Sequence, residues 1–319
     1  MNEFKIINNY FKVLAKKNPS AKKLNDDVFF DKKKGVVISL DTYNSGIHFL
    51  GFEYPYYIVK KIIRSSLSDL ICKGVKPKYY FLSGGGNKQT FTKKNLSLIS
   101  KSLKEEQKKY SIEIGGGDTV YSKIPSFSVT TIGFAKNIIE RNRAKKDDDI
   151  YVTGSIGDSF IGLKVIQKKY LMENKLKKYF IYKYYCPDIP YNFSKYLFSF
   201  ANTSIDISDG LISDMMRLIN SQKLSFSIDV DKIPISKKLN NFLKKYNKPK
   251  NKLVFNGDDY QILFTSSKSN RLRIRTIANQ LNQKVTIIGK INDGYKKNLL
   301  KEGNKSLKLS SFKGYSHKF

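Results

Sequence analysis

Aspartate residues recur in this chain just after short apolar runs and beside glycine, serine or threonine. Asp41 follows the run at residues 36–40, and Asp118 follows three consecutive glycines. An aspartate at the carboxyl end of a strand lies at the sheet edge where α/β proteins bind ligands. Carboxylates that converge there repel one another, and an all-oxygen ligand set without His or Cys favours Mg²⁺ as the neutralising cation. The aspartates in such positions are Asp26, Asp27, Asp41, Asp69, Asp118, Asp206, Asp209, Asp258 and Asp259.

The glycines at residues 115–117 predict a close approach of the backbone to a ligand. Because glycine lacks a Cβ atom, the N–H groups of this segment could face phosphate oxygens, and Asp118 would bring a metal to the same place. A single glycine-flanked aspartate is more often a turn or a helix cap, but seven such placements are harder to explain in this way. The chain has no P-loop, no HRD or DFG motif, no GxGxxG fingerprint and no GxSxG elbow. A phosphate would therefore be bound by a different scaffold.

The chain is strongly basic, with 59 Lys and Arg against 27 Asp and Glu and a formal net charge of +32. A nucleic-acid-binding protein would be expected to cluster these charges on one face, between aromatic residues. The lysines are instead scattered along the whole sequence, with short clusters such as residues 32–34 and 244–245. We therefore expect solvated surface lysines and no specific nucleic-acid partner, while the positive field would still attract phosphorylated small molecules.

Two cysteines and two histidines limit the other chemistries. Cys72 and Cys186 form no CxxC pair, and this set could not build a conventional zinc site. The first residues do not resemble a signal peptide, and lysines interrupt each hydrophobic run before it could span a bilayer. We expect a cytoplasmic protein without a membrane association.

The apolar pattern predicts alternating helices and strands in two halves. Residues 141–149 are charged and lack periodicity, which predicts a linker. The predicted domains are residues 1–140 and residues 141–319, in an α/β (α+β) fold. Helices are predicted over 3–17, 56–73, 95–110, 159–170 and 211–220. Strands are predicted over 36–40, 79–82, 112–114, 126–134, 150–153, 204–207, 226–230, 260–264 and 285–291.

Motifs along nearly the whole chain resemble those of the thiamine-monophosphate kinase family. This family belongs to the superfamily of aminoimidazole-ribonucleotide synthetase and selenophosphate synthetase. The set is highly specific, although no single motif is. The matching segments are residues 3–4, 26–27, 39–41, 46–49, 67–70, 116–119, 141 with 144–145, 152–154, 205–211, 257–260 and 314–317.

The resemblance implies an ATP-dependent conversion of thiamine monophosphate to thiamine diphosphate. It also implies a homodimer whose N-terminal domains pair through their sheets, with a C-terminal α/β sandwich domain that closes over the site. The implied Mg²⁺ ligands are Asp27, Ser39, Leu40 through its carbonyl, Asp41, Asp69, Asp118, Asp206 and Asp209. The implied ATP contacts are Gly117, Asp118, Arg141 and Ser208, and the implied thiamine monophosphate contacts are His48, Asp258 and Tyr315. We expect no essential protein base or nucleophile.

The chain departs from the family pattern at a few positions, which bear on loop geometry and substrate affinity more than on the reaction class. Asn25 and Asn256 replace usual glycines, Gln261 replaces a usual glutamate, and the segment 186–190 lacks the usual arginines. Another ATP-dependent synthetase of the superfamily is the alternative enzyme. Selenophosphate synthetase is disfavoured because no cysteine lies near the N-terminus.

Overall fold

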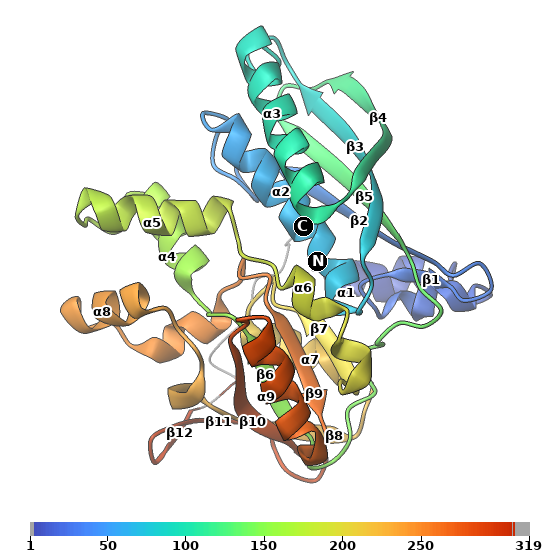
Figure 1. Cartoon of the computed structure of the whole chain (residues 1–319), viewed down its shortest axis with the longest axis vertical. Coiled ribbons are helices and arrows are strands. Elements are labelled where there is room, and N and C mark those ends of the chain that lie inside the picture. The colour runs from blue at the N-terminus through green and yellow to red at the C-terminus, as the bar shows by residue number, and fades with distance from the viewer. Residues whose placement is uncertain (1–2, 308, 310–319) are drawn as a thin grey trace.

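The computed structural model describes residues 3–307 and residue 309, and the strands of this part form two separate sheets (Figure 1). The first sheet has five strands in the order β1-β2-β5-β3-β4. The second has seven strands in the order β12-β11-β8-β10-β6-β9-β7. The predicted mixed α/β fold class is confirmed. The strands of the first sheet precede residue 141 in the sequence, and those of the second sheet follow it. The division into domains at that residue stays a proposal.

The first sheet carries two long helices on one face, α2 (Pro55–Cys72) and α3 (Lys93–Tyr110). Its strands are β1 (Phe29–Asp31), β2 (Val36–Asn44), β3 (Pro77–Gly86), β4 (Glu113–Tyr121) and β5 (Ser126–Phe134). Alternation along β2 turns Ser39, Asp41 and Tyr43 toward α2 and leaves Leu40 on the opposite, open face. Polar groups on β2 are thereby directed toward a buried helix.

The second sheet is mostly antiparallel, with β11 parallel to β8. Its strands are β6 (Asp149–Thr153), β7 (Thr203–Asp206), β8 (Leu224–Asp229), β9 (Ile262–Ser266), β10 (Val285–Asp293), β11 (Leu299–Glu302) and β12 (Lys305–Leu307). The helices of this half are α4 (Asp158–Ile166), α5 (Asn174–Tyr185), α6 (Tyr191–Ser194), α7 (Leu211–Leu218), α8 (Lys237–Lys245) and α9 (Arg271–Gln280).

Helix α2 connects the two halves. It begins with Pro55 at its first turn and ends before Gly74, which has a φ of +77°. It packs against β2 and β5 on one side and against α5, α6 and β7 on the other, so nearly all of its residues are buried. One apolar cluster spans both halves and includes Phe49, Ile62, Phe127, Tyr184, Phe193 and Phe264. The two sheets therefore share part of their core through α2.

Three segments differ from the sequence-based expectation. The predicted helix over 3–17 is a short α-helix, α1 (Glu3–Ile6), followed by a π-helical turn (Ile7–Phe11) and turns. The strand predicted over 112–114 extends through the glycines at residues 115–117 as part of β4. The predicted linker at 141–149 is irregular but ends inside the core, where Thr265 and Asn202 donate hydrogen bonds to the buried Asp148. Within the described part of the chain, no helix combines the length and apolarity needed to span a bilayer.

Candidate active site

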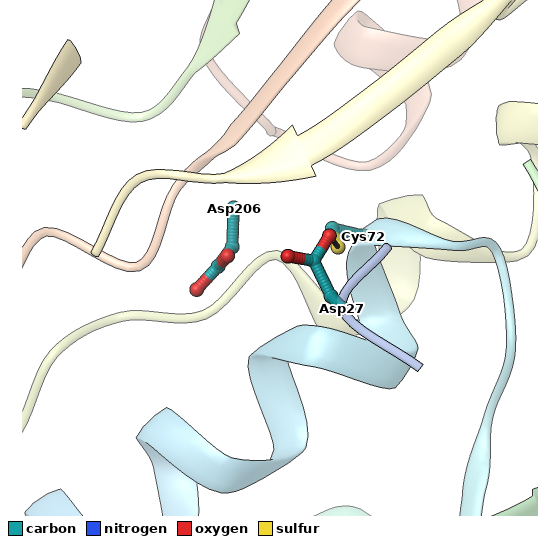
Figure 2. A group of neighbouring side chains, drawn as sticks. All are labelled: Asp27, Cys72 and Asp206. Atoms are coloured by element: carbon teal, nitrogen blue, oxygen red, sulfur yellow. Dashed lines mark hydrogen bonds between the residues drawn. The ribbon is translucent and has the colours of Figure 1, made fainter. Parts of the chain in front are cut away.

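Two aspartates and a cysteine from distant parts of the chain converge at the carboxyl end of α2 (Figure 2). Asp27 precedes β1, Cys72 ends α2, and Asp206 ends β7. One ligand atom from each of these three residues lies within 4.8 Å of the others. The Cys72 thiol donates to the Asp69 carbonyl at 3.1 Å, so its proton already has a partner. The carboxylates are the groups in this cluster that remain suited to a hard cation.

Two further carboxylates, Asp41 and Asp69, lie beside this cluster. Burial raises the pKa of Asp41 to about 6, although the Tyr43 hydroxyl donates to it at 3.2 Å. Burial also raises the pKa of Asp69 well above its usual range, and the charges of Asp41 and Asp206 raise it further. Ser39 donates a hydrogen bond to Asp69. The site thus holds partly buried carboxylates whose negative charge is poorly compensated.

Asp206 belongs to the same electrostatic group. The Ser68 hydroxyl of α2 donates to its Oδ2 at 2.7 Å. Burial raises the pKa of Asp206, and the negative charge of Asp41 adds to this effect. Ser68 and Asp69 are neighbours on α2. Ser68 contacts Asp206 of the second sheet, and Asp69 contacts Ser39 of the first sheet, so one turn of this helix connects the two sheets.

Two cations neutralise part of this negative charge. The ammonium of Lys73 is fully buried and lies 2.7 Å from Asp26 and 2.6 Å from Asp27, and it donates to the Ser204 carbonyl at 2.8 Å. Burial opposes the charged form of Lys73, but the surrounding acidic groups, with Asp26 first, together outweigh it and the pKa is raised. Arg141 pairs with Asp27 through its guanidinium, and its backbone N–H donates to Asp26 at 3.0 Å. These two cations face the five carboxylates of Asp26, Asp27, Asp41, Asp69 and Asp206, so negative charge is in excess.

The loop after β7 contains two more predicted site residues, Ser208 and Asp209. The N–H groups of Ser208, Asp209 and Gly210 all donate to Asp214 Oδ2 at 3.1 Å. The Asp209 carboxylate pairs with Arg217 and is not brought into the cluster around Asp206. These backbone donors are therefore occupied within the chain, and an ATP contact by Ser208 would use its side chain.

Asp118 and Gly117 lie apart from the cluster. Asp118 of β4 lies opposite Ser83 of β3. Ser83 lies opposite Ser128 of β5, and Ser128 lies opposite Thr42 of β2. Three strand spacings of about 4.8 Å place Asp118 about 14 Å from Thr42, on the open face opposite to Asp41. Gly117 admits no side chain, because a Cβ would lie 1.9 Å from the Leu82 carbonyl oxygen. The roles of Gly117 and Asp118 stay predictions.

The predicted acceptor contacts His48 and Asp258 come from different halves of the chain and are connected. Asp258 pairs with Lys61 at 2.9 Å and accepts from the Tyr260 hydroxyl at 2.9 Å. The Lys61 ammonium lies 3.5 Å from the centre of the Tyr184 ring, and the Tyr184 hydroxyl donates to the His48 carbonyl at 3.0 Å. The third predicted contact, Tyr315, lies outside the described residues, as does His317.

Two of the departures from the family pattern contact each other. Gln261 donates to the Asp188 carbonyl and accepts from the Thr153 hydroxyl at 3.0 Å, so it connects β6 to the segment 186–190. Asn25 donates to Asn220 and Ser221 at 3.0 Å each and thus links the two halves near Asp26. Gln261 and Asn25 thus contact segments that border the site.

Comparisons with known proteins agree with this architecture. A family model described as AIR synthase related protein, N-terminal domain, matches residues 25–135. The chain is 35% identical over 328 residues to the thiamine-monophosphate kinase of Buchnera aphidicola subsp. Schizaphis graminum, covering 99% of this chain and 98% of the relative. It is 30% identical to the thiamine-monophosphate kinase of Aquifex aeolicus, covering 80% of this chain and 84% of the relative.

Among solved structures, AaThiL complexed with AMPPCP and TMP is similar to this chain, with a TM-score of 0.86 and 26% identity. The similarity covers 99% of this chain and 97% of the AaThiL chain. The HypE–HypF complex matches with a TM-score of 0.72 at 15% identity over 98% of each chain, which indicates a shared fold.

Proposed function

This chain belongs to the thiamine-monophosphate kinase family, and we propose that its reaction takes place at the carboxylate cluster of Asp27, Asp41, Asp69 and Asp206. The chain transfers a phosphoryl group from ATP to thiamine monophosphate and forms thiamine diphosphate and ADP. The observation that supports the location is the convergence of these buried carboxylates from both halves.

The residues of the cluster fit Mg²⁺ as the metal. Carboxylate and hydroxyl oxygens of α2, β2 and β7 converge here, and burial together with neighbouring negative charge raises the pKa of Asp69 and Asp206. When bound, Mg²⁺ would offset the charges of these carboxylates and of the substrate phosphates. We propose Asp27, Ser39, the Leu40 carbonyl, Asp41, Asp69 and Asp206 as its ligands, with Asp118 and Asp209 as further ones. Cys72 has no proposed role, since a thiol suits softer metals.

The reaction needs no base from the protein. A phosphate monoester has a second pKa near about 6, so the acceptor is mostly deprotonated at neutral pH. Phosphoryl transfer depends mainly on positioning and electrostatics. The work of this chain is therefore to hold two anionic substrates close together, and Arg141 is the fixed cation that we assign to the nucleotide. We propose direct transfer with both substrates bound.

We propose a homodimer that forms through the open face of the first sheet. This face carries exposed apolar side chains, with Leu40 at 66%, Phe134 at 55% and Val120 at 54% exposure. A second copy would cover them. Asp118 lies on the same face, so Gly117 and Asp118 would contribute to a nucleotide site formed with the partner subunit. A cytoplasmic location, which the two free buried cysteines support, is also part of this proposal.

Chromatographic product analysis tests this function. We expect thiamine diphosphate and ADP in equal amounts from thiamine monophosphate, ATP and Mg²⁺, and no product when a chelator removes the metal. Free thiamine should be a poor acceptor, because the site is arranged to receive a phosphate. Release of inorganic phosphate without thiamine diphosphate would favour another ATP-dependent synthetase of the superfamily.

A further inference from the structure

We propose that Lys61 positions the thiamine monophosphate acceptor by holding the Asp258 carboxylate in a fixed orientation. Lys61 does not itself touch the substrate in this account, since it acts through Asp258. The inference rests on the proposed function, in which Asp258 contacts the acceptor.

The burial of Lys61 is unusual in a chain whose charges are mostly on the surface. The side chain of Lys61 is 2% exposed, and its ammonium lies between Asp258 and the ring of Tyr184. Lys60, its neighbour on α2, faces Glu105 and Glu106 of α3 instead. A buried ammonium is costly unless it is paired, so Lys61 must have a specific partner. That partner is a predicted substrate contact.

The contacts of Asp258 fix one of its oxygens. Lys61 and the Tyr260 hydroxyl both approach Oδ1, each at 2.9 Å. Within the described part of the chain, no residue forms a hydrogen bond with Oδ2, and the Asp258 side chain is 28% exposed. The backbone of Asp258 is also constrained, since it has a φ of +67° and its N–H donates to the Ser208 carbonyl at 2.9 Å. The carboxylate therefore presents Oδ2 from a fixed position beside the loop that contains Ser208.

Tyr184 extends this arrangement to the other predicted acceptor contact. Its ring lies against the Lys61 ammonium, and its hydroxyl donates to the His48 carbonyl at 3.0 Å. His48 accepts at Nδ1 from the Asn44 N–H at 3.0 Å, which fixes the orientation of the imidazole. Lys61 and Tyr184 thus set the relative positions of Asp258 and His48.

The chemistry of the acceptor matches this arrangement. Thiamine monophosphate carries a thiazolium cation and an aminopyrimidine with N–H donors, and either group can pair with a carboxylate oxygen. Its phosphate would be repelled by Asp258. The contacts of Lys61 and the Tyr260 hydroxyl at Oδ1 direct Oδ2 toward the cationic part of the acceptor. Without Lys61, the carboxylate would be free to turn.

Steady-state kinetics of Lys61→Met, with Lys60→Met as the matched control, test this inference. Loss of a charge-assisted contact that orients Asp258 should raise KM for thiamine monophosphate about tenfold or more. KM for ATP and turnover at saturation should change little, and Lys60→Met should leave KM for the acceptor unchanged. Asp258→Asn should raise the same KM, and the Lys61→Met, Asp258→Asn double variant should show no further rise.

A structural role alone would lower the melting temperature of Lys61→Met without this selective effect on KM. An unchanged KM, an equal rise in both KM values, or additive effects in the double variant would each overturn the inference. If Lys61→Met does not fold, Tyr260→Phe removes the hydroxyl that donates to Oδ1 and should also raise KM for the acceptor; an unchanged value would overturn the inference. Wild-type protein that forms no thiamine diphosphate would instead contradict the proposed function.

Discussion

At the scale of single residues, the site consists of carboxylates such as Asp41 and Asp69, whose removal from water costs folding free energy. Burial raises the pKa of Asp41 to about 6 and that of Asp69 well above its usual range. Such carboxylates destabilise the metal-free protein, since each is kept from water near others of the same charge. Their presence together is therefore better explained by a bound cation than by stability.

The variant Asp41→Asn distinguishes a metal-binding role of Asp41 from a purely structural one. The amide keeps the shape of the side chain and an acceptor for Tyr43, but it removes the charge. Loss of one electrostatic anchor of a transition state should lower turnover by about a hundredfold or more. The metal-free variant should melt no lower than the wild type, because a repelling buried charge is removed. Kinetics and thermal unfolding measure the two effects.

Asp31→Asn is the matched control. Asp31 ends β1 and accepts from the N–H groups of Lys33 and Lys34 in a turn, which an amide oxygen can also do. This variant should keep normal turnover. If Asp41→Asn retained near-normal turnover but melted at a lower temperature, Asp41 would be a structural residue and the metal assignment would be wrong.

The aspartates of the candidate site were easier to predict from the sequence than the lysines that pair with them. Asp27, Asp41, Asp69 and Asp206 follow apolar runs or lie in recognisable motifs, and the structure brings them to one region. Lys61 and Lys73 gave no comparable signal among 59 basic residues. For Lys61, the usable signal was its position on α2, since residues 61, 65, 68 and 72 fall on one helical face.

At the scale of elements, apolar periodicity predicted most helices and strands to within a few residues. The strand at 126–134 and the helix at 56–73 correspond to β5 and to α2 (Pro55–Cys72). The predicted strand at 112–114 was too short, because the glycines at 115–117 carry no strand pattern and their place in β4 depends on pairing with β3. Long-range pairing of this kind leaves no local pattern.

The open face of the first sheet should form the dimer interface. Phe134→Lys places a charge on a side chain that is 55% exposed on this face, so the monomer should still fold. Two copies of this charge in a symmetric interface should weaken the dimer by about tenfold or more. Sedimentation analysis over a range of concentrations measures the shift toward monomer.

Leu272→Lys is the control for this interface. Leu272 is 66% exposed on α9, which belongs to the second sheet's half of the chain. The Leu272→Lys variant should leave the monomer–dimer equilibrium unchanged. A wild-type protein that sediments as a monomer, or a dimer that Phe134→Lys does not affect, would contradict pairing through this sheet.

At the scale of the whole molecule, the two halves are joined by a shared core and by the site itself. Lys73 reaches from α2 to the Ser204 carbonyl of β7, and Ser68 reaches Asp206. The sequence indicated two halves but not this contact, because it depends on the packing of α2 against both sheets. The boundary region at 141–149 looked like a solvated linker since charge is typical of linkers, but Asp148 and Asp149 are buried with specific partners.

The net charge of +32 should have a general electrostatic effect and no specific nucleic-acid partner. Non-specific DNA affinity at physiological salt is typically in the range of about 0.1 mM to 1 µM and falls steeply with salt. Fluorescence anisotropy with unrelated DNA duplexes should give similar, weak and salt-sensitive binding. Tight binding that distinguishes one sequence from the others would revive the nucleic-acid hypothesis.

In the proposed reaction, the γ-phosphoryl group of ATP passes directly to the phosphate of thiamine monophosphate in a site built from carboxylates. Incubation with γ-³²P-labelled ATP and Mg²⁺ tests this direct transfer. With the acceptor present, we predict label in the terminal phosphate of thiamine diphosphate, and with ATP alone we predict no labelled protein. Label trapped on the protein, or label released as inorganic phosphate while thiamine monophosphate stays unmodified, would contradict the account.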